Sequence, residues 1–205
     1  MNEYTSVTRV SEYTYEDRKS VFIGEISPAS TEAEALAFLE HAKKKYPDAK
    51  HHVFAYILRE NNLCRFSDDG EPQGTAGLPV LDLLKKQNLT DVVAVVTRYF
   101  GGTLLGTGGL VRAYTEAAAG ALRAAGTAVF SMYTVVSFCV SYGDYQRLGT
   151  VAGALGFRTL SADFSENVSV TGCLKSEFFD AFCKKMSEMT GGKIKISVIE
   201  KIFSS

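Results

Sequence analysis

The sequence predicts an α+β fold in two domains. Its 205 residues accommodate one or two domains of about 100–200 residues each. Alternating and β-branched segments, which are typical of strands, are interspersed with segments of helical periodicity along the whole chain. The texture of the sequence changes after residue 130, so we place a boundary near Phe130–Thr134 and expect domains at 1–130 and 131–205.

Residues 1–130 carry a local signal for each expected element. Thr31 has capping-box spacing to Glu34 at the start of a helix, and Pro47 ends that helix. The continuous β-branched run 92–97 predicts a strand buried on both faces. The expected apolar face of the first helix consists of Leu36, Leu39, Ala42 and Tyr46. The expected strands are 4–14, 20–26 (joined near 15–19), 52–59, 63–66 and 92–97, and the expected helices are 31–46, 79–87 and 110–125.

Residues 131–205 read as a second pattern of strands and helices. The order of the expected elements is βαββαβ, which is the split pattern of ferredoxin-like domains. Aromatic and methionine side chains at helical spacing near the C-terminus are expected to form core. The expected strands are 135–142, 159–164, 168–174 and 194–199, and the expected helices are 145–156 and 175–190.

Composition points to a soluble globular protein without a strong overall charge. Hydrophobic residues make up 46% of the chain, charged residues 22%, and the formal net charge is −1. Residues 1–130 hold 14 of the 22 Lys+Arg and 16 of the 23 Asp+Glu, so they carry −2 and the remainder carries +1. Any nucleic-acid site must therefore be a local patch, because a global positive field is lacking.

Neither a membrane partner nor secretion is expected. The longest apolar run, Val92–Val96, is far shorter than the roughly 20 residues that cross a bilayer. The N-terminal stretch MNEYTSVTRV has no apolar signal region. The cysteines stand apart at 64, 139, 173 and 183, so we expect reduced, buried thiols in a cytoplasmic protein.

A glycine-rich stretch between the strand 92–97 and the helix after it suits an anionic ligand. Glycine lets the backbone approach a ligand closely, and a helix N-terminus offers free amide groups to an anion. Arg98 precedes the stretch and Arg112 follows it, and two guanidinium groups there suit a phosphate or carboxylate. In the alternative, the glycines only form tight turns, and the arginines pair with nearby carboxylates such as Asp68 or Asp69. The glycines are Gly101, Gly102, Gly106, Gly108 and Gly109.

A second polar loop, 67–77, concentrates carboxylates. Asp68, Asp69 and Glu71 have the chemistry to hold Mg²⁺ or to supply an acid/base pair. They equally suit the capping of turns, or pairing with Arg98 and Arg112 across a site. The spacing of an EF-hand is absent, and we expect no metal site and no cofactor.

The pair His51–His52 precedes an expected strand. Adjacent residues of a strand point to opposite faces, so these two side chains do not easily bind one metal ion. One of them is a candidate acid/base or hydrogen-bond donor, and a structural histidine is the alternative. A nucleophilic pair of Cys64 with His51 across the hairpin also stays open.

Two long motifs carry a specific resemblance. The segments RFSDDGEPQGTAGLPVLDLL (65–84) and VVAVVTRYFGGTLLGTGGLVRAYTEAA (92–118) resemble the signatures of the IMPACT/YigZ family, over about residues 15–126, and the chain is similar to the bacterial two-domain members. The resemblance implies a domain like the second domain of ribosomal protein S5, followed by a ferredoxin-like domain similar to the fifth domain of elongation factor G. His51 falls at the family's histidine, whereas Val53 stands where many members have cysteine.

The resemblance also implies a function. Eukaryotic relatives regulate translation initiation through a protein partner, and nucleic-acid or ribosome binding is suggested for bacterial members. We therefore expect a translation-associated regulator that binds RNA, the ribosome or a phosphate-bearing ligand, with an enzyme on a small anionic substrate or a protein-interaction regulator as alternatives. The expected ligand-binding residues are Arg65, Asp68, Arg98, Tyr99, Gly101, Gly102, Gly106, Gly108, Gly109 and Arg112, and the acid/base candidates are His51, Asp69 and Glu71.

Overall fold

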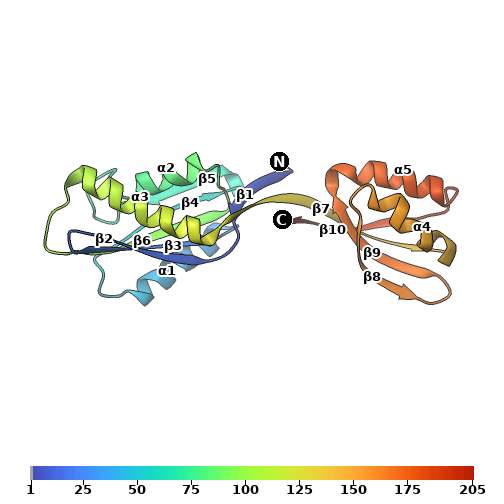
Figure 1. The fold of residues 1–205 in the computed structure, drawn as a ribbon, viewed down its shortest axis with the longest axis horizontal. Coiled ribbons are helices and arrows are strands. Elements are labelled where there is room, and N and C mark those ends of the chain that lie inside the picture. Colours follow the sequence, from blue (N-terminus) through green and yellow to red (C-terminus); the bar gives the residue numbers. More distant parts are fainter. Residues whose placement is uncertain (1) are drawn as a thin grey trace. The chain divides into compact units, whose positions relative to one another are not determined.

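A computed structural model describes residues 2–205 and confirms a mixed α/β protein with antiparallel sheets, consistent with the predicted α+β class. The described chain divides into two compact units (Figure 1). One unit comprises Tyr4–Val129. The other comprises Phe130–Ser205 together with the N-terminal Asn2 and Glu3.

The first unit is built on a five-stranded sheet with the order β2-β3-β6-β4-β5. The neighbouring strands of this sheet are all antiparallel. The strand β6 lies at its centre, and the candidate motifs flank β6 and β4. The strands are β2 (Ser11–Asp17), β3 (Ser20–Pro28), β4 (His51–Leu58), β5 (Leu63–Ser67) and β6 (Val92–Tyr99).

Helices cover both faces of this sheet. The helix α1 (Glu32–Lys45) lies on one face, and α2 (Gly77–Lys86) and α3 (Gly106–Ala125) lie on the other (Figure 1). Val92, Ala94 and Val96 pack into the core beneath α2 and α3, whereas Val93 and Val95 pack toward α1. The alternation with period two therefore places apolar side chains on both faces of β6, as its continuous β-branched run predicts.

The start of α1 confirms the predicted capping signal, but the buried face of the helix differs from the prediction. The hydroxyl of Thr31 accepts a hydrogen bond from the amide of Glu34 at 3.2 Å, and the Glu34 carboxylate accepts one from the amide of Ser30 at 2.7 Å. The buried residues are Ala35, Leu39 and Ala42, while Leu36 is 43% exposed. The buried face of α1 therefore includes Ala35 in place of the predicted Leu36.

The N-terminal strands are divided differently from the prediction. The chain forms β1 (Glu3–Val7), breaks, and forms β2 from Ser11 to Asp17, so the turn before β3 is shorter than the predicted 15–19. Arg18 and Lys19 form this turn with φ of 46° and 66°. Two-residue hairpin turns require such positive φ values and usually carry Asn-Gly or Asp-Gly, so Arg-Lys gave no recognisable turn signal.

The helix α3 begins at Gly106 rather than at the predicted 110. Gly106, Gly108 and Gly109 therefore lie in its first turn, and the irregular loop is confined to residues 100–105. Gly101 is required by close packing, because a Cβ atom there would lie 2.0 Å from the carbonyl carbon of Lys19.

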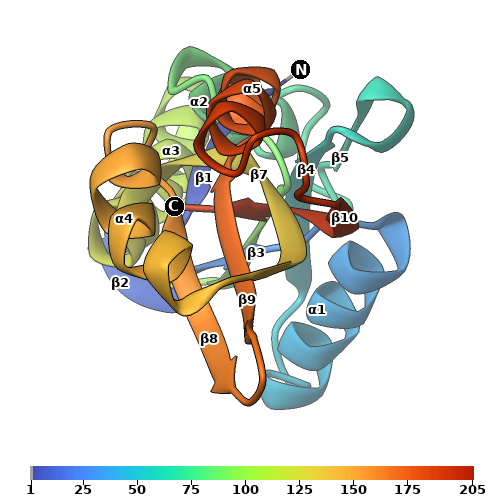
Figure 2. The same ribbon diagram turned by 90° about the vertical axis from the view of Figure 1, so that its right-hand side faces the viewer.

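The second unit has the element order βαββαβ, with the strands in the order β10-β7-β9-β8. All three of these pairings are antiparallel, and β1 also lies beside β7 in this sheet. Phe138, Phe182 and Met186 form part of its core, and Figure 2 shows its strands β8 and β9 side by side. The elements are β7 (Thr127–Val140), α4 (Tyr142–Gly153), β8 (Arg158–Phe164), β9 (Val168–Lys175), α5 (Phe179–Met189) and β10 (Ile196–Ser204).

Several boundaries in this unit differ from the prediction. The strand β7 begins at Thr127 rather than 135, and β10 extends to Ser204 rather than 199. Pairing between β7 and β10 from Ser131 to Phe138 supports both extensions, which no local composition signal marks.

Two further expectations concern the thiols and membranes. All four cysteines are free, but Cys64 and Cys139 are exposed, so the expectation of buried thiols is wrong for these two.

Among residues 2–205, no helix is long and apolar enough to span a membrane.

Candidate functional site

The two motif-bearing loops meet at a cavity of about 400 Å³ in the first unit. The start of β4, the loop after β5, the end of β6 and the start of α3 all contribute to its lining. Its charged and titratable lining residues are Lys50, His51, Glu71 and Arg98. The sequence segments that predicted ligand binding are thus brought together by the antiparallel pairing of β4 with β6, which sets His51 opposite Arg98.

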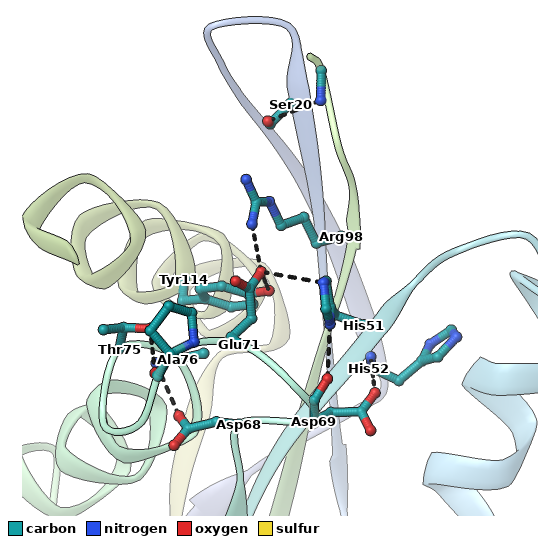
Figure 3. Close-up of polar contacts among 12 residues, drawn as sticks. Ser20, His51, His52, Asp68, Asp69, Glu71, Thr75, Ala76, Arg98 and Tyr114 are labelled. Atoms are coloured by element: carbon teal, nitrogen blue, oxygen red, sulfur yellow. Dashed lines mark hydrogen bonds and ion pairs between the residues drawn. The ribbon is translucent and has the colours of Figure 1, made fainter. Parts of the chain in front are cut away.

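A buried ion pair forms the wall of the cavity (Figure 3). Arg98 Nη1 donates to Glu71 Oε1 at 2.5 Å, and the Tyr114 hydroxyl donates to the same oxygen at 2.7 Å. The side chains of Arg98 and Glu71 are only 6% and 4% exposed. Burial, followed by the hydrogen bond to Glu71, raises the pKa of Tyr114 well above its ordinary value, so the hydroxyl stays a donor.

Arg98 retains donors that the protein does not use. Its Nε lies buried without a hydrogen-bond partner in the described chain, and Nη2 makes no hydrogen bond there either. The guanidinium carbon is 5.3 Å from the centroid of the Phe22 ring and 5.5 Å from that of Phe100. A buried donor without a partner is unfavourable, so a ligand acceptor at this position gains more than a surface contact does.

His51 turns one ring nitrogen toward this wall. Its Nδ1 lies 2.7 Å from the backbone carbonyl oxygen of Asp69, and a carbonyl can only accept, so Nδ1 carries a proton. Its Nε2 lies 4.0 Å from Glu71 Oε1 and is the nitrogen available to a bound group (Figure 3). A histidine whose Nδ1 is fixed by a carbonyl is oriented for proton transfer or hydrogen bonding at Nε2.

His52 lies on the opposite face, as the strand geometry predicts. Its Nδ1 is 3.1 Å from the Thr97 hydroxyl, and its backbone amide donates to Asp69 Oδ2 at 2.6 Å. Burial lowers the pKa of His52. The ring is therefore a neutral structural group, and only His51 of the pair reaches the cavity.

The three carboxylates of the loop have separate tasks. Asp68 accepts hydrogen bonds from the amides of Gly74, Ala76 and Gly77 at 2.8–3.1 Å, which fixes the loop and the start of α2. Asp69 bonds to His52, and Glu71 bonds to Arg98. Within residues 2–205, no three His, Cys, Asp or Glu side chains are grouped to hold a metal ion. The capping and ion-pair interpretation is therefore the one the geometry supports.

The first turn of α3 opens on the cavity without a side-chain cap. The N-cap residue Leu105 supplies no acceptor, and no acidic residue lies in the first turn. Gly106 and Thr107 line the cavity, whereas Gly101 donates its amide to the Ser20 hydroxyl at 3.1 Å and packs away from it. Free amides and the positive end of the helix dipole thus face the same space as Arg98 and Lys50.

Other residues singled out in the sequence lie outside the lining. Arg65 is exposed on β5, where its Nε is 3.1 Å from Glu32 Oε1, and Arg112 is exposed on α3. Tyr99 ends β6 beside the cavity residues without lining it. Gly102, Gly108 and Gly109 also do not line it.

The nucleophilic pair of Cys64 with His51 is wrong. Cys64 lies opposite Ile57 in the hairpin, whereas His51 is six positions from Ile57 along β4. At the rise of a strand, six positions correspond to roughly 20 Å, so these side chains do not meet.

Sequence reasoning missed three contributors to the site. Lys50 directly precedes His51 and lines the cavity, but a single lysine next to the histidine pair gives no distinctive sequence signal. Leu104 is 81% exposed at the loop tip and carries no chemical signal in the sequence. Tyr114 is the single aromatic residue of the alanine-rich α3, and that isolation was the available signal.

The fold and the site together define a class: a two-unit α+β protein whose first unit holds a cavity lined by Lys50, His51, Glu71 and Arg98. A family model described as "Impact N-terminal domain" matches residues 18–122, and one described as a "Domain of unknown function" (DUF1949) matches 140–193. The chain belongs to the IMPACT family, which confirms the resemblance carried by the two motifs.

Similar proteins cover most of the chain. The IMPACT family member YvyE of Bacillus subtilis is 38% identical over 200 residues, covering 96% of this chain and 91% of the relative. YigZ of Escherichia coli is 32% identical over 189 residues, covering 91% and 93%. The Bos taurus "Protein IMPACT" is 33% identical over 94 residues, covering 44% of this chain and 30% of that protein. A crystal structure titled as a hypothetical protein has a TM-score of 0.64 at 30% identity, with 98% of both chains covered.

Proposed function

We propose that this IMPACT family protein is a cytoplasmic, translation-associated regulator that binds a phosphate group of RNA or of the ribosome in the cavity of its first unit. The observation that carries the proposal is the uncapped start of α3, which faces the same cavity as the unused donors of Arg98. The similarity to eukaryotic IMPACT proteins, for which the resemblance implies a regulatory role, supports this part of the proposal. The proposal includes domains at 1–130 and 131–205, the first S5 domain 2-like and the second ferredoxin-like, as the strand order β10-β7-β9-β8 supports.

The charges of the cavity favour an anion. Glu71 is the acidic group in the lining, and its ion pair with Arg98 offsets it. Lys50 then leaves an excess positive charge, and the α3 dipole adds roughly half a positive charge at its N-terminus. Since the chain as a whole carries −1, attraction of RNA is confined to this local patch.

RNA binding measured over a series of salt concentrations, with one lysine variant and one arginine variant, tests the proposal. Binding of fluorescently labelled single-stranded RNA is measured between about 50 and 200 mM salt for the unaltered protein, Lys50→Ala and Arg112→Ala. Each lost phosphate contact lowers the salt slope by about 0.7 on a single strand. We expect that loss in Lys50→Ala and none in Arg112→Ala, which removes an exposed charge outside the cavity. Absent binding, or equal loss in both variants, contradicts the proposal.

An enzyme acting on a small phosphorylated substrate is the second candidate. The fixed Nδ1 proton of His51 and the free Nε2 facing Glu71 favour it, because this is the orientation that a general base requires. A panel of phosphorylated metabolites and nucleotides is screened for a rise in melting temperature. Turnover of a stabilising compound, abolished in His51→Asn but not in His41→Asn, supports the enzyme. A panel without any stabilising compound contradicts it.

A further inference from the structure

We propose that the cavity recognises a terminal nucleotide that carries a phosphomonoester, with the phosphate at the start of α3 and the base against the exposed side chains of Phe100 and Leu104. This inference rests on the proposed function and names the class of ligand that its site accepts. Such a nucleotide is supplied by the end of an RNA strand or by a free nucleoside monophosphate.

The cavity offers more hydrogen-bond donors than the phosphodiester of an internal nucleotide can accept. The first four amides of α3 have no acceptor within the helix, Arg98 contributes Nε and Nη2, and Lys50 contributes its ammonium group. The side chain of Arg98 is 6% exposed, so its spare donors are held inside the protein. A diester offers two non-bridging oxygens, whereas a monoester offers three and carries a charge of about −1.5 to −2.

The same loop offers an apolar surface next to those donors. Phe100 is 48% exposed and Leu104 is 81% exposed, and both line the cavity. Exposed aromatic rings beside a phosphate site stack nucleic-acid bases without reading their identity. Phe100 also lies 5.5 Å from the guanidinium carbon of Arg98, so a base stacked on its ring stays within reach of the phosphate donors.

The size and charge of the site favour one nucleotide over a long strand. A volume of about 400 Å³ falls at the lower end of small-ligand cavities, which span roughly 300–1,000 Å³. Residues 1–130 carry a formal −2, with 14 basic against 16 acidic residues. A long groove that follows a polyanion requires a continuous basic surface, which this composition does not supply.

Binding is compared for RNA decamers of one sequence with a 5′-phosphate, a 3′-phosphate, free hydroxyls at both ends, or a circular backbone, and for a free nucleoside monophosphate. We expect at least tenfold tighter binding of one phosphorylated end than of the hydroxyl and circular forms. The two phosphorylated arms identify which end is bound. The free monophosphate should compete with the preferred decamer for the same site.

Phe100→Ala tests the base contact, and Phe66→Ala serves as the matched control. Phe66 is 43% exposed on β5 and does not line the cavity. We expect Phe100→Ala to weaken binding of the phosphorylated decamer about 10- to 100-fold, as the loss of one stacked base does. Phe66→Ala should leave it unchanged. Equal loss in both variants overturns the base contact.

The outcomes separate this inference from the proposed function. Equal binding of circular, hydroxyl-ended and phosphate-ended RNA overturns the inference and leaves RNA phosphate binding in place. Binding of the free monophosphate alone, without any RNA, supports the inference and contradicts the RNA function. If neither the RNA decamers nor the free monophosphate binds, both the inference and the proposed function are overturned.

Discussion

At the scale of the residue, Arg98 takes one of the two roles that the sequence left open, and the proposed function assigns it the other. It pairs with a carboxylate, but the partner is Glu71 rather than Asp68 or Asp69. Its Nε and Nη2 make no hydrogen bond within residues 2–205, and the proposed function uses these donors. The helix α2 and most of β6 separate Glu71 from Arg98 in the sequence, and the fold brings their side chains together.

Removal of Arg98 should destabilise the protein strongly. Arg98→Met leaves the Glu71 carboxylate buried without its cationic partner, which typically costs about 3–5 kcal/mol. The change in unfolding free energy is measured by urea denaturation. The double variant Arg98→Met/Glu71→Gln should lose less than the sum of the single changes, because the unpaired charge is gone. A loss below about 1 kcal/mol in Arg98→Met contradicts the buried pair.

His52 should make the stability depend on pH in the mildly acidic range. Burial lowers its pKa in the folded protein, so between that pKa and the unfolded value of about 6.5 the unfolded chain binds more protons. The contribution is therefore complete above the unfolded pKa and is lost as the pH falls below it. Unfolding free energies from pH 7.5 to 5 should decrease, and His52→Asn should flatten this slope. The exposed His41 provides the control, and an unchanged slope in His52→Asn would refute the assignment.

At the scale of the element, two loops are held by contacts that composition does not reveal. The carboxylate of Asp68 fixes the entry to α2 through three backbone amides. Gly101 lets the loop after β6 pack against the turn between β2 and β3. Both loops contribute residues to the lining of the cavity.

Asp68→Ala should destabilise the first unit by about 2–3 kcal/mol, since it leaves amides at the buried positions Ala76 and Gly77 without a charged acceptor. Thermal and urea unfolding measure the loss. Asp82→Ala, at an exposed position of α2, should change stability by less than about 0.5 kcal/mol. Similar values for the two variants would exclude the capping role of Asp68.

Substitution by alanine should have opposite effects on stability at Gly101, which is closely packed, and at Gly108, which lies in a helix. Gly101→Ala places a Cβ within 2.0–2.3 Å of the backbone of Lys19 and Ser20, whereas Gly108→Ala meets no atom within 4 Å. We expect Gly101→Ala to lose about 3 kcal/mol through overpacking. Gly108→Ala should gain up to about 1 kcal/mol, because alanine favours the helix. Calorimetry distinguishes the two, and a tolerated Gly101→Ala argues against the close approach.

The sequence predicts elements better than their ends. The capping of α1, the hairpin of β4 and β5, and the doubly buried β6 each follow from a local signal. The Arg18–Lys19 turn and the early start of α3 do not, because left-handed φ values at Arg and Lys and a helix begun by glycines contradict local preference. The cavity required the pairing of β4 with β6, which motif spacing does not specify.

At the scale of the whole molecule, each unit is a sheet with its own hydrophobic core. All residues that line the cavity belong to the first unit. The family match over 18–122 covers the same part of the chain. The proposed ligand site therefore lies entirely within the first unit.

The most direct test is an amide NMR titration of the whole chain with the phosphorylated RNA decamer. The account predicts that the amide resonances of Gly106 and Thr107 shift most and saturate together, since these residues open the first turn of α3 and line the cavity. Lys50→Ala should weaken the titration, and Arg112→Ala should not. Largest shifts within residues 130–205, or no shift at the start of α3, would contradict phosphate recognition in this cavity.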